Sequence, residues 1–585
     1  MKLQEIEMLR LKIFAKLAAA TSLTALVCMS ANAQDRISDF SLVDADGRFF
    51  QLSRNAHKNA IVLLAYDMES RDARRAAGDL EDLAEQFADQ QVDFLVINST
   101  GLADKTVMRE EAEDEDISLR ILMDDTQLVA EELGLTRAAE VAIIDPQASA
   151  VVYRGALSSR HADGSRSERN AGSYAEEALT AILAGGEISS ETLASTGDAL
   201  DFTAKTAFLE SVTYADDVAP ILEQRCSACH QEGGVAPFAM ESHQMIQGWS
   251  PMIRESLMTK RMPPGQIDNE YVQAFHDINH ITVEETQKLV HWIDTGARNE
   301  GSTDPLAALD ISPAKWLNGE PDMIIDIPPQ QIPATGVLEY RNLVVPLDID
   351  EDVWVKAVEF EAGDPAVLHH IIAFSYGPDG INQFEILNQG IGLGAYAPGN
   401  ELNLYPENAG FPLEAGGGLL LQMHYTVSGK ETVDASQIGL YLWEEEPEKV
   451  VLGGSAADMD IDVPPFSTKE MVATKTFRED VYLSMLGPHM HFRGYDANFK
   501  LRYPDGRVEE VLNIPNYQFN WQKVYDFKEP MFLPAGTELV FRGTFDNTEY
   551  NPNNPDPSVT LNWGEQTWQE MFFGFFRYTE ADSGE

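Results

Sequence analysis

Cysteine is scarce in this chain of 585 residues, which contains only three. Cys28 lies ahead of Ala31-Asn32-Ala33, a small-x-small pattern that predicts cleavage of an N-terminal export signal. The mature chain would then keep only Cys226 and Cys229, too few for the disulfide framework of a small secreted protein. We therefore assign both remaining thiols to one shared task.

Positive charge is also scarce, with 42 Lys and Arg against 95 Asp and Glu and a formal net charge of -53. Such a surface repels phosphate backbones and anionic lipid headgroups, which excludes nucleic acid and membrane surfaces as partners. Two interpretations of the acidic surface are left. It is either simply well solvated, or it includes a docking face for a basic redox partner.

Long apolar runs are missing after the N-terminus. Arg10, Lys12 and Lys16 precede the apolar stretch Leu17–Val27, as in a secretory signal, so we predict a signal peptide over residues 1–33. No later segment approaches the roughly 20 apolar residues of a membrane helix. The prediction is a periplasmic or secreted protein with no membrane insertion after signal cleavage.

The rest of the chain divides by pattern, and its length suggests several domains. Residues 34–185 alternate strand-like and helix-like runs, for example a strand over Asn59–Tyr66 and a helix over Arg71–Gln90, which predicts an α/β domain. The further predicted parts are a linker at 186–205, an all-α domain at 206–302, and two all-β sandwich domains at 310–452 and 453–585.

The motif Cys226-Ser227-Ala228-Cys229-His230 lies in the predicted helical domain. A Cys-x-x-Cys-His sequence places two thiols on one helical turn, where each can form a thioether with a haem vinyl group, and the following His faces the iron. A zinc site would need two further Cys or His ligands at similar spacing. A redox dithiol would be expected after a strand of the α/β domain. The motif therefore predicts covalent haem c.

Residues 206–302 resemble a small class I cytochrome c. The resemblance rests on the motif, the segment Tyr214–Glu223 before it, the loop Met262-Pro263-Pro264-Gly265, and a last helix that includes Trp292-Ile293-Asp294. It implies that the sixth iron ligand is a Met in a Pro-rich loop, which corresponds to Met262. The competing side chains are Met252, Met258, His243, His276 and His280.

Five histidines follow residue 305, as an adjacent pair, a single residue and an i,i+2 pair. His489 and His491 are on a predicted strand, where the period of two points both rings to one face. The adjacent pair His369-His370 needs a bend or bulge to share a metal, so it is a weak signal by itself. As a set, the five with His424 favour metal binding over scattered structural histidines.

The second half of the chain, residues 315–576, resembles the type II copper, ascorbate-dependent monooxygenases, that is, the peptidylglycine hydroxylating and dopamine β-monooxygenases. In that family two tandem sandwiches hold two coppers across a solvent-filled gap. The resemblance implies an electron-transfer copper held by His369, His370 and His424. It implies an oxygen-binding copper held by His489, His491 and Met571, a ligand set that suits Cu(I).

Residues that differ from those of the family limit the class of substrate that is expected. Its disulfides are missing, and Gly487, Phe573 and Phe575 stand where the peptide-amidating members carry Arg, Asn and Tyr. A C-terminal carboxylate would have no clamp, which disfavours peptide amidation. The Phe-rich run from Phe572 to Phe576 suggests an apolar wall, although alternate members of a strand must face the core.

Residues 34–185 resemble the thioredoxin-like redoxins, as in peroxiredoxins, through Phe40-Ser41-Leu42, a strand and a long helix. The loop that should hold the catalytic Cys reads Tyr66-Asp67-Met68-Glu69-Ser70, and Arg137-Ala138-Ala139-Glu140 replaces the usual cis-Pro. Thiol chemistry, including thiol peroxidase activity, is therefore excluded for this domain. A docking or structural role is what is left.

Together these features predict an exported monooxygenase with covalent haem c and two copper ions. It would hydroxylate a C–H bond of a small apolar or aromatic substrate with dioxygen, while the haem relays electrons from an ascorbate-like reductant or a periplasmic redox protein. The catalytic residues would be His489, His491 and Met571. The alternative is a non-catalytic haem and copper protein that transfers electrons or binds copper.

Overall fold

A computed structural model describes residues 36–581, apart from 103, 164–171, 187–192, 310–314 and 381–391. The expected signal peptide over 1–33 lies outside the described residues. Among the residues that are described, no helix has the length and apolar character needed to cross a membrane.

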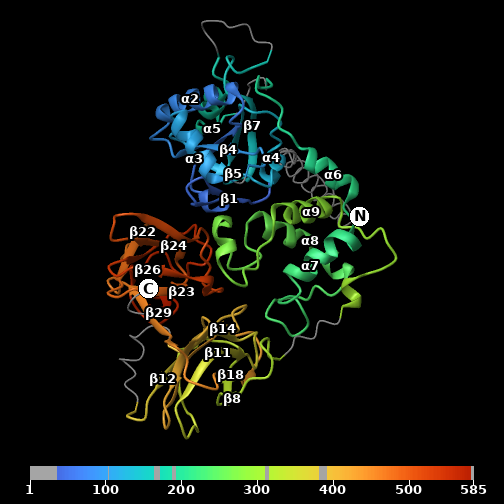
Figure 1. Cartoon of the computed structure of the whole chain (residues 1–585). Coiled ribbons are helices and arrows are strands. Elements are labelled where there is room, and N and C mark those ends of the chain that lie inside the picture. The colour runs from blue at the N-terminus through green and yellow to red at the C-terminus, as the bar shows by residue number, and fades with distance from the viewer. Residues whose placement is uncertain are drawn as a thin grey trace, which may run out of the picture.

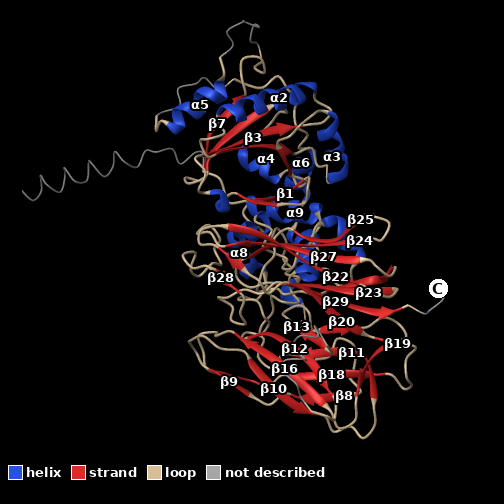
Figure 2. Ribbon diagram, turned by 90° about the vertical axis from the view of Figure 1, so that its left-hand side faces the viewer, coloured by secondary structure: helices blue, strands red, loops and turns tan. Residues whose placement is uncertain are grey.

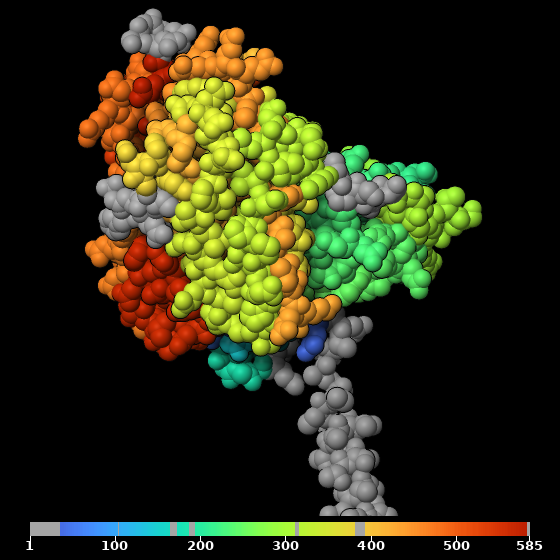
Figure 3. All heavy atoms as spheres, turned by 90° about the horizontal axis from the view of Figure 1, so that it is seen from below, coloured from blue at the N-terminus to red at the C-terminus, as the bar shows by residue number. Residues whose placement is uncertain are grey.

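Four regions are arranged around a common centre (Figures 1 and 2). The N-terminal α/β region lies at one end and the first β region, residues 315–452, at the other. Between them the helical region and the second β region, residues 453–581, lie side by side. Seen from below, the first β region covers the face of the molecule, with the helical region on one flank and the second β region on the other (Figure 3).

The N-terminal region is a seven-stranded sheet with the order β2-β1-β5-β4-β3-β6-β7. Its interior strand β3 is an unbroken apolar run that is buried on both faces, as expected where helices cover both sides of a sheet. The elements are β1 (Ser41–Asp44), β2 (Phe49–Gln51), a 3-10 turn (Ser53–Asn55), β3 (Ala60–Tyr66), α2 (Arg71–Gln86), β4 (Val92–Asn98), α3 (Lys105–Asp114), β5 (Arg120–Met123), α4 (Leu128–Leu133), β6 (Glu140–Asp145), β7 (Ala150–Ala156) and α5 (Tyr174–Leu183).

The segment expected to form a linker packs against this region instead. Residues 193–200 run along it through backbone bonds, including Ala138 N to the Asp198 carbonyl at 2.8 Å and Leu200 N to the Thr136 carbonyl at 2.9 Å. The next helix begins at Thr203, inside the predicted linker range. The backbone N–H of Ala138 is therefore already paired within the chain and cannot pair with a bound peptide.

Within the described residues 203–308 the named elements are helices joined by loops, and none is a strand. The expected helix over Tyr214–Glu223 is split into a π-helical turn and α7, which has Pro220 in its first turn, where a missing N–H costs nothing. The elements are α6 (Thr203–Ser211), the π turn (Tyr214–Val218), α7 (Ala219–Arg225), α8 (His243–Met258), a 3-10 turn (Asn269–Ala274), α9 (Val283–Asp294) and a 3-10 turn (Leu306–Ala308).

The first β region has two main sheets over one apolar core, with strand orders β10-β16-β12-β13 and β19-β15-β11-β18-β8. Its strands are β8 (Met323–Asp326), β9 (Gln330–Ile332), β10 (Arg341–Pro346), β11 (Val353–Glu361), β12 (Leu368–Tyr376), β13 (Gly394–Tyr396), β14 (Leu402–Leu404), β15 (Ala409–Leu413), β16 (Gly418–Tyr425), β17 (Thr432–Asp434), β18 (Gln437–Leu442) and β19 (Lys449–Val450).

The second β region repeats the two-sheet plan, with orders β20-β29-β23-β26 and β22-β27-β24-β25. Its inner faces form a core rich in Phe, Leu and Tyr. Its strands are β20 (Leu452–Ala457), β21 (Asp462–Val463), β22 (Thr468–Thr476), β23 (Val481–His489), β24 (Gly494–Arg502), β25 (Val508–Ile514), β26 (Tyr525–Leu533), β27 (Glu538–Asp546), β28 (Leu561–Asn562) and β29 (Phe573–Glu580). We refer to the two β regions as the first and second sandwich.

Three of the regions meet at a buried polar junction. The Lys105 ammonium of the N-terminal region pairs with Asp268 of the helical region, and both side chains are less than a tenth exposed. Asn513 of the second sandwich donates from Nδ2 to the Gly47 carbonyl at 2.9 Å and to Asp268 Oδ2 at 3.3 Å. The junction therefore fixes the N-terminal region against both of its neighbours.

Candidate metal centre

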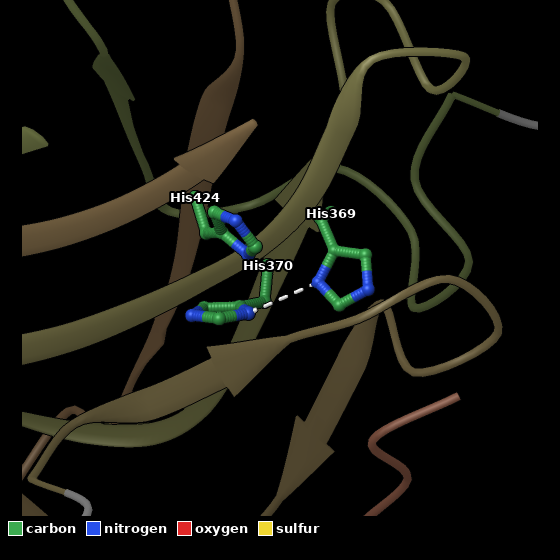
Figure 4. A group of neighbouring side chains, drawn as sticks. All are labelled: His369, His370 and His424. Atoms are coloured by element: carbon green, nitrogen blue, oxygen red, sulfur yellow. Dashed lines mark hydrogen bonds between the residues drawn. The ribbon is translucent and has the colours of Figure 1, made fainter. Parts of the chain in front are cut away.

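Three histidines of the first sandwich form a buried cluster. One ring nitrogen from each of His369, His370 and His424 lies within 4.8 Å of the others, and the three side chains are 2–6% exposed. Figure 4 shows the rings gathered where two neighbouring strands meet, with a dashed line between the nitrogens of His369 and His370. Those two Nδ1 atoms are 3.2 Å apart, within hydrogen-bond distance, whereas the Nε2 atoms of both rings have no protein partner.

Strand pairing explains how an adjacent pair can share one site. His370 lies opposite His424 in the β12–β16 ladder, and the register shifts between Leu368 and His370. That irregularity turns His369 to the same side as His370, where a regular strand would point them apart. The bulge that the sequence required is therefore confirmed.

The second set lies at the end of β23, in the second sandwich. The strand ends at His489, so the prediction that both residues lie within it is wrong for His491. The rings of His489 and His491 are nonetheless 5.3 Å apart, while Met490 between them is fully buried in the core. The alternation of sides thus persists past the end of the strand.

Each ring of this set has one nitrogen already engaged. His489 Nδ1 donates to Gln522 Oε1 at 2.7 Å, and His491 Nδ1 donates to the Gln569 carbonyl at 3.1 Å. In a neutral imidazole, an engaged Nδ1–H leaves Nε2 with a free lone pair, which is the usual arrangement of a metal ligand. The Nε2 atom of His491 is buried and has no protein partner.

Glu570 connects Met571 to this set. Its carboxylate accepts the backbone N–H of His491 and of Arg493, each at 2.9 Å, and also that of Met571. Burial raises the pKa of Glu570 to about 8, and the backbone donors and the Arg493 guanidinium oppose that rise. Glu570 therefore ties the segment directly before Met571 to the backbone at His491, and the assignment of Met571 as a ligand stays a prediction.

The two sets adjoin each other. The ring centroids of His370 and His489 are 6.3 Å apart, and the Phe519 ring stacks on His369 at 4.7 Å and meets His491 edge-on at 5.6 Å. The solvent-filled gap implied by the family resemblance does not separate these rings. All five histidines instead form one cluster at the junction of the two sandwiches.

Burial keeps the cluster uncharged. Burial, together with neighbouring imidazoles for His369 and His424, lowers the pKa of His369 to about 3 and the pKa of His424 and of His489 to about 4. The pKa values of His370 and His491 are also well below the usual value, for the same reason. Neutral imidazoles are the form that binds metal.

The donor set fits copper. Besides His491, the rings of His369, His370 and His424 each have a buried nitrogen without a protein partner. An unsatisfied buried polar atom costs about 1–3 kcal/mol, so this arrangement is one that a bound cation stabilises. Five imidazoles, with no carboxylate among the predicted ligands, suit a borderline ion such as copper.

Two phenylalanines line the second set. Phe573 and Phe575 stack on each other at 5.5 Å, and their rings lie 6.5 and 6.0 Å from that of His489. Phe572 and Phe576 point the other way and are buried in the core. The expected alternation is confirmed, and two aromatic side chains form an apolar surface beside His489.

The Cys-x-x-Cys-His motif forms the single turn that haem attachment requires. His230 N donates to the Cys226 carbonyl at 2.9 Å, and Cys229 N donates to it at 3.2 Å. His230 Nδ1 donates to the Phe238 carbonyl at 3.0 Å, which leaves Nε2 for an iron. Both thiols are free and partly exposed. The residues therefore fit a covalently held haem.

The position of the motif is fixed by the helices on either side. Arg225, the last residue of α7, pairs with Glu285 at 3.1 Å. Glu285 also completes a capping box with Thr282 at the start of α9. Because one carboxylate serves both helices, the turn that begins at Cys226 has a fixed place.

Several competitors for the sixth iron position have other roles. His243 Nε2 donates to the Ala297 carbonyl at 2.8 Å, and Met258 is buried in the core between the N-terminal region and the helices. Met262 lines a small pocket with Leu257 and Ile281. Its assignment as the sixth ligand stays a prediction.

Sequence reasoning missed the residues that support the ligands. These are Tyr340, whose ring lies 4.6 Å from that of His424, Phe519, Asn520, which hydrogen-bonds His369, Gln522, Arg493 and Glu570. The sequence could have indicated Glu570, because an acidic residue directly before a predicted ligand in a Phe-rich run is unusual. The others come from loops that carry no periodic signal.

The comparisons with known proteins concern the N-terminal region. A model of the AhpC/TSA family matches residues 33–154, and no curated protein matches the chain. The similar solved structures include a hypothetical protein from Sinorhizobium meliloti 1021, with 22% identity and a TM-score of 0.26, which covers 30% of this chain and 97% of that one. Another is a peroxidoxin from Mycobacterium tuberculosis, with 21% identity, a TM-score of 0.21, and coverage of 26% and 95%.

The family match and the sheet order confirm the predicted thioredoxin-like domain at the N-terminus. The loop after β3, where a catalytic cysteine would be expected, ends at Ser70 and contains no cysteine. The haem and copper interpretations rest on the residues and their geometry alone.

Proposed function

We propose that this chain is an exported, copper-dependent monooxygenase that carries covalent haem c. The observation that carries the proposal is the single buried cluster in which His369, His370 and His424 of one sandwich adjoin His489 and His491 of the other. Copper in such a site would supply the one-electron chemistry that activates dioxygen and inserts one of its atoms into a C–H bond. The other atom leaves as water, with two electrons and two protons consumed.

Each set of residues has its own task in this proposal. His369, His370 and His424 hold the ion that supplies an electron, and His489, His491 and Met571 hold the ion that meets dioxygen. Two cysteines and His230 hold the haem, and Met262 is the expected sixth ligand. A small-molecule donor such as ascorbate, or a periplasmic redox protein, would supply the electrons.

The substrate surface supports a small apolar or aromatic molecule. Phe573 and Phe575 are the side chains beside His489 at the places where peptide-amidating enzymes carry polar groups. They would exclude water and contact an apolar substrate. Gln522 would keep the proton on Nδ1 of His489, so that Nε2 faces the metal.

A second candidate is a non-catalytic haem and copper protein that transfers electrons or binds copper. The burial of all five imidazoles, none more than 6% exposed, favours it. Reaction with dioxygen decides between the two. A monooxygenase consumes dioxygen faster with copper than without it, and a store or carrier does not.

The first experiment measures copper and haem together on purified, copper-reconstituted protein, followed by dioxygen uptake with a reductant. We expect two copper ions per haem, falling to about one in the double variant Met571→Ala, His489→Ala. The expected uptake depends on copper and is lost in that variant. Intact haem without stoichiometric copper would overturn the proposal, and copper without uptake would favour the second candidate.

A further inference from the structure

One loop of the second sandwich, residues 519–523, contacts both histidine sets. Its Phe519 ring stacks on His369 with the two planes 20° apart, and the same ring meets His491 edge-on. Three residues later, Gln522 accepts the Nδ1 proton of His489 at 2.7 Å. The loop is therefore part of the surroundings of both proposed copper ligand sets.

The next residue, Lys523, points the other way, into the helical region. Its Nζ donates to the Asp277 carbonyl at 2.6 Å, and its aliphatic stem packs on Gly265, where a Cβ would lie 3.4 Å from Lys523 Cδ. Burial lowers the pKa of Lys523, and the carboxylates of Asp277, Glu401 and Asp526 oppose that change. The half-buried ammonium of Lys523 thus joins the loop to the backbone of the helical region at Asp277.

Two residues beyond Asp277, the chain returns to the haem motif. Asn279 Nδ2 donates to the Arg225 carbonyl at 2.8 Å. That carbonyl is bonded directly to the nitrogen of Cys226, the first cysteine of the motif. A connected series of bonds thus runs from Cys226 through Asn279, Asp277, Lys523 and Gln522 to His489.

The surrounding contacts make this connection rigid. Phe275 and Phe527 pair across the boundary between helical region and second sandwich, and their rings are 4.5 Å apart. Beside them, His276 N donates to the Asp526 carbonyl at 2.9 Å, and Tyr525 Oη donates to the Gly265 carbonyl at 3.3 Å. The segment that carries Asp277 and Asn279 is therefore fixed along the start of β26.

We propose that residues 277–279 and 522–523 form the electron-transfer connection between the haem motif and the histidine cluster, with Lys523 as the positioning residue that closes it. This inference rests on the proposed function. In each passage a ferrous haem is oxidised to ferric and one Cu(II) is reduced to Cu(I). Insertion of one oxygen atom needs two electrons, so the connection is used twice, and an external one-electron donor restores the ferrous haem each time.

The test uses the full holoprotein with haem reduced and copper present as Cu(II), and it follows haem oxidation by absorbance after rapid mixing without dioxygen. We expect Lys523→Met to slow this transfer clearly, because it removes the bond from Nζ to the Asp277 carbonyl that closes the connection. Lys523→Arg keeps a cation and a donor and should restore most of the rate. Lys528→Met, at an exposed lysine in the strand that follows the loop, is the control and should leave the rate unchanged.

A second variant at the other link, Asn279→Leu, makes the test independent of Lys523. Because both bonds serve one connection, the double variant should be little slower than either single variant. The copper content, haem content and haem potential of each variant are measured alongside the rate. Loss of rate with these values unchanged supports the connection.

Wild-type rates in both Lys523→Met and Asn279→Leu would overturn the inference and leave the proposed function standing. A slow rate explained fully by a shifted haem potential would also overturn it. Failure of the wild-type protein to bind copper would overturn the proposed function itself, so the two failures are distinguishable.

Discussion

The first sandwich holds its three histidines within one sheet, whereas the second presents its two at the end of β23, where regular pairing stops. His370 and His424 are direct cross-strand partners. His489 and His491 depend on side chains and carbonyls from loops, chiefly Gln522, Gln569 and Glu570. The first set is therefore held by a strand ladder, whereas the second is held by hydrogen bonds from loop residues that can be substituted one at a time.

Removing one ligand from each set is the change with the largest expected effect. His370→Ala and His491→Ala should each reduce bound copper from two ions to one, because each removes a nitrogen of a different site. In the wild type the rings of His370 and His489 lie close enough for the two Cu(II) ions to interact magnetically. Electron paramagnetic resonance should therefore show an isolated signal only in the single-site variants. His57→Ala, in the N-terminal region, is the control, and retention of both ions in either variant would contradict the two-site assignment.

Glu570→Ala should affect only the second set, and strongly. It removes the acceptor of three backbone N–H groups and leaves the buried Arg493 without its neighbouring carboxylate. We expect a loss of about 3 kcal/mol in the free energy of unfolding, measured by denaturant titration of the metal-free protein. The exposed Glu565→Ala should change it little. An equal loss in both variants would mean that the carboxylate network does not hold this site.

Gln522→Leu is a milder change at the same set. Without the acceptor for Nδ1, His489 is free to rotate or change tautomer, and loss of such a supporting bond lowers metal affinity by about 10–100-fold. Competition titration with a copper chelator should show this loss at the second site and an unchanged first site. Gln518→Leu, directly before that loop, provides the comparison. Equal weakening of both sites would show that the loop acts on the whole cluster rather than on His489.

The smallest expected effect is on the number of protons released when copper binds, and it is the same for both histidine sets. The folded-state pKa values of the five histidines lie below the unfolded value of about 6.5, so they stay neutral in the metal-free protein at pH 5.5. Copper binding at that pH should release almost no protons, whereas solvent-exposed imidazoles would release roughly 0.9 each. Because the five pKa values are lower in the folded than in the unfolded state, the free energy of unfolding of the metal-free protein falls as the pH falls below 6.5. A titration in weak buffer measures the release, and several protons per chain would show that the cluster is open to water.

Local patterns predicted the parts of the site that lie within strands. The strand at Ala60–Tyr66 and the bulge at His369 follow from apolar runs and from the geometry of an adjacent pair. The helix from Arg71 ends at Gln86 rather than at the predicted Gln90. The prediction is too long because the amphipathic pattern of the sequence continues past the last helical residue. Residue periodicity therefore located elements well and their ends less well.

Contacts between regions could not be predicted in this way. The approach of His370 to His489 depends on how two separate sandwiches dock, and docking leaves no period in the sequence. Phe519 and Gln522 lie in a loop where neighbouring residues face different sites. Their roles follow only from the fold, as does the packing of residues 193–200 against the N-terminal region instead of a free linker.

The buried pair of Lys105 and Asp268 has a consequence for how the molecule responds to ionic strength. With a net charge of -53, exposed carboxylates push the regions apart in dilute buffer, and salt screens that repulsion beyond a Debye length of about 10 Å at 0.1 M. The pair at the junction is shielded from solvent, so the same salt weakens it far less. Salt should therefore draw the four regions closer together, and the assembled protein should become more compact in brine than in dilute buffer.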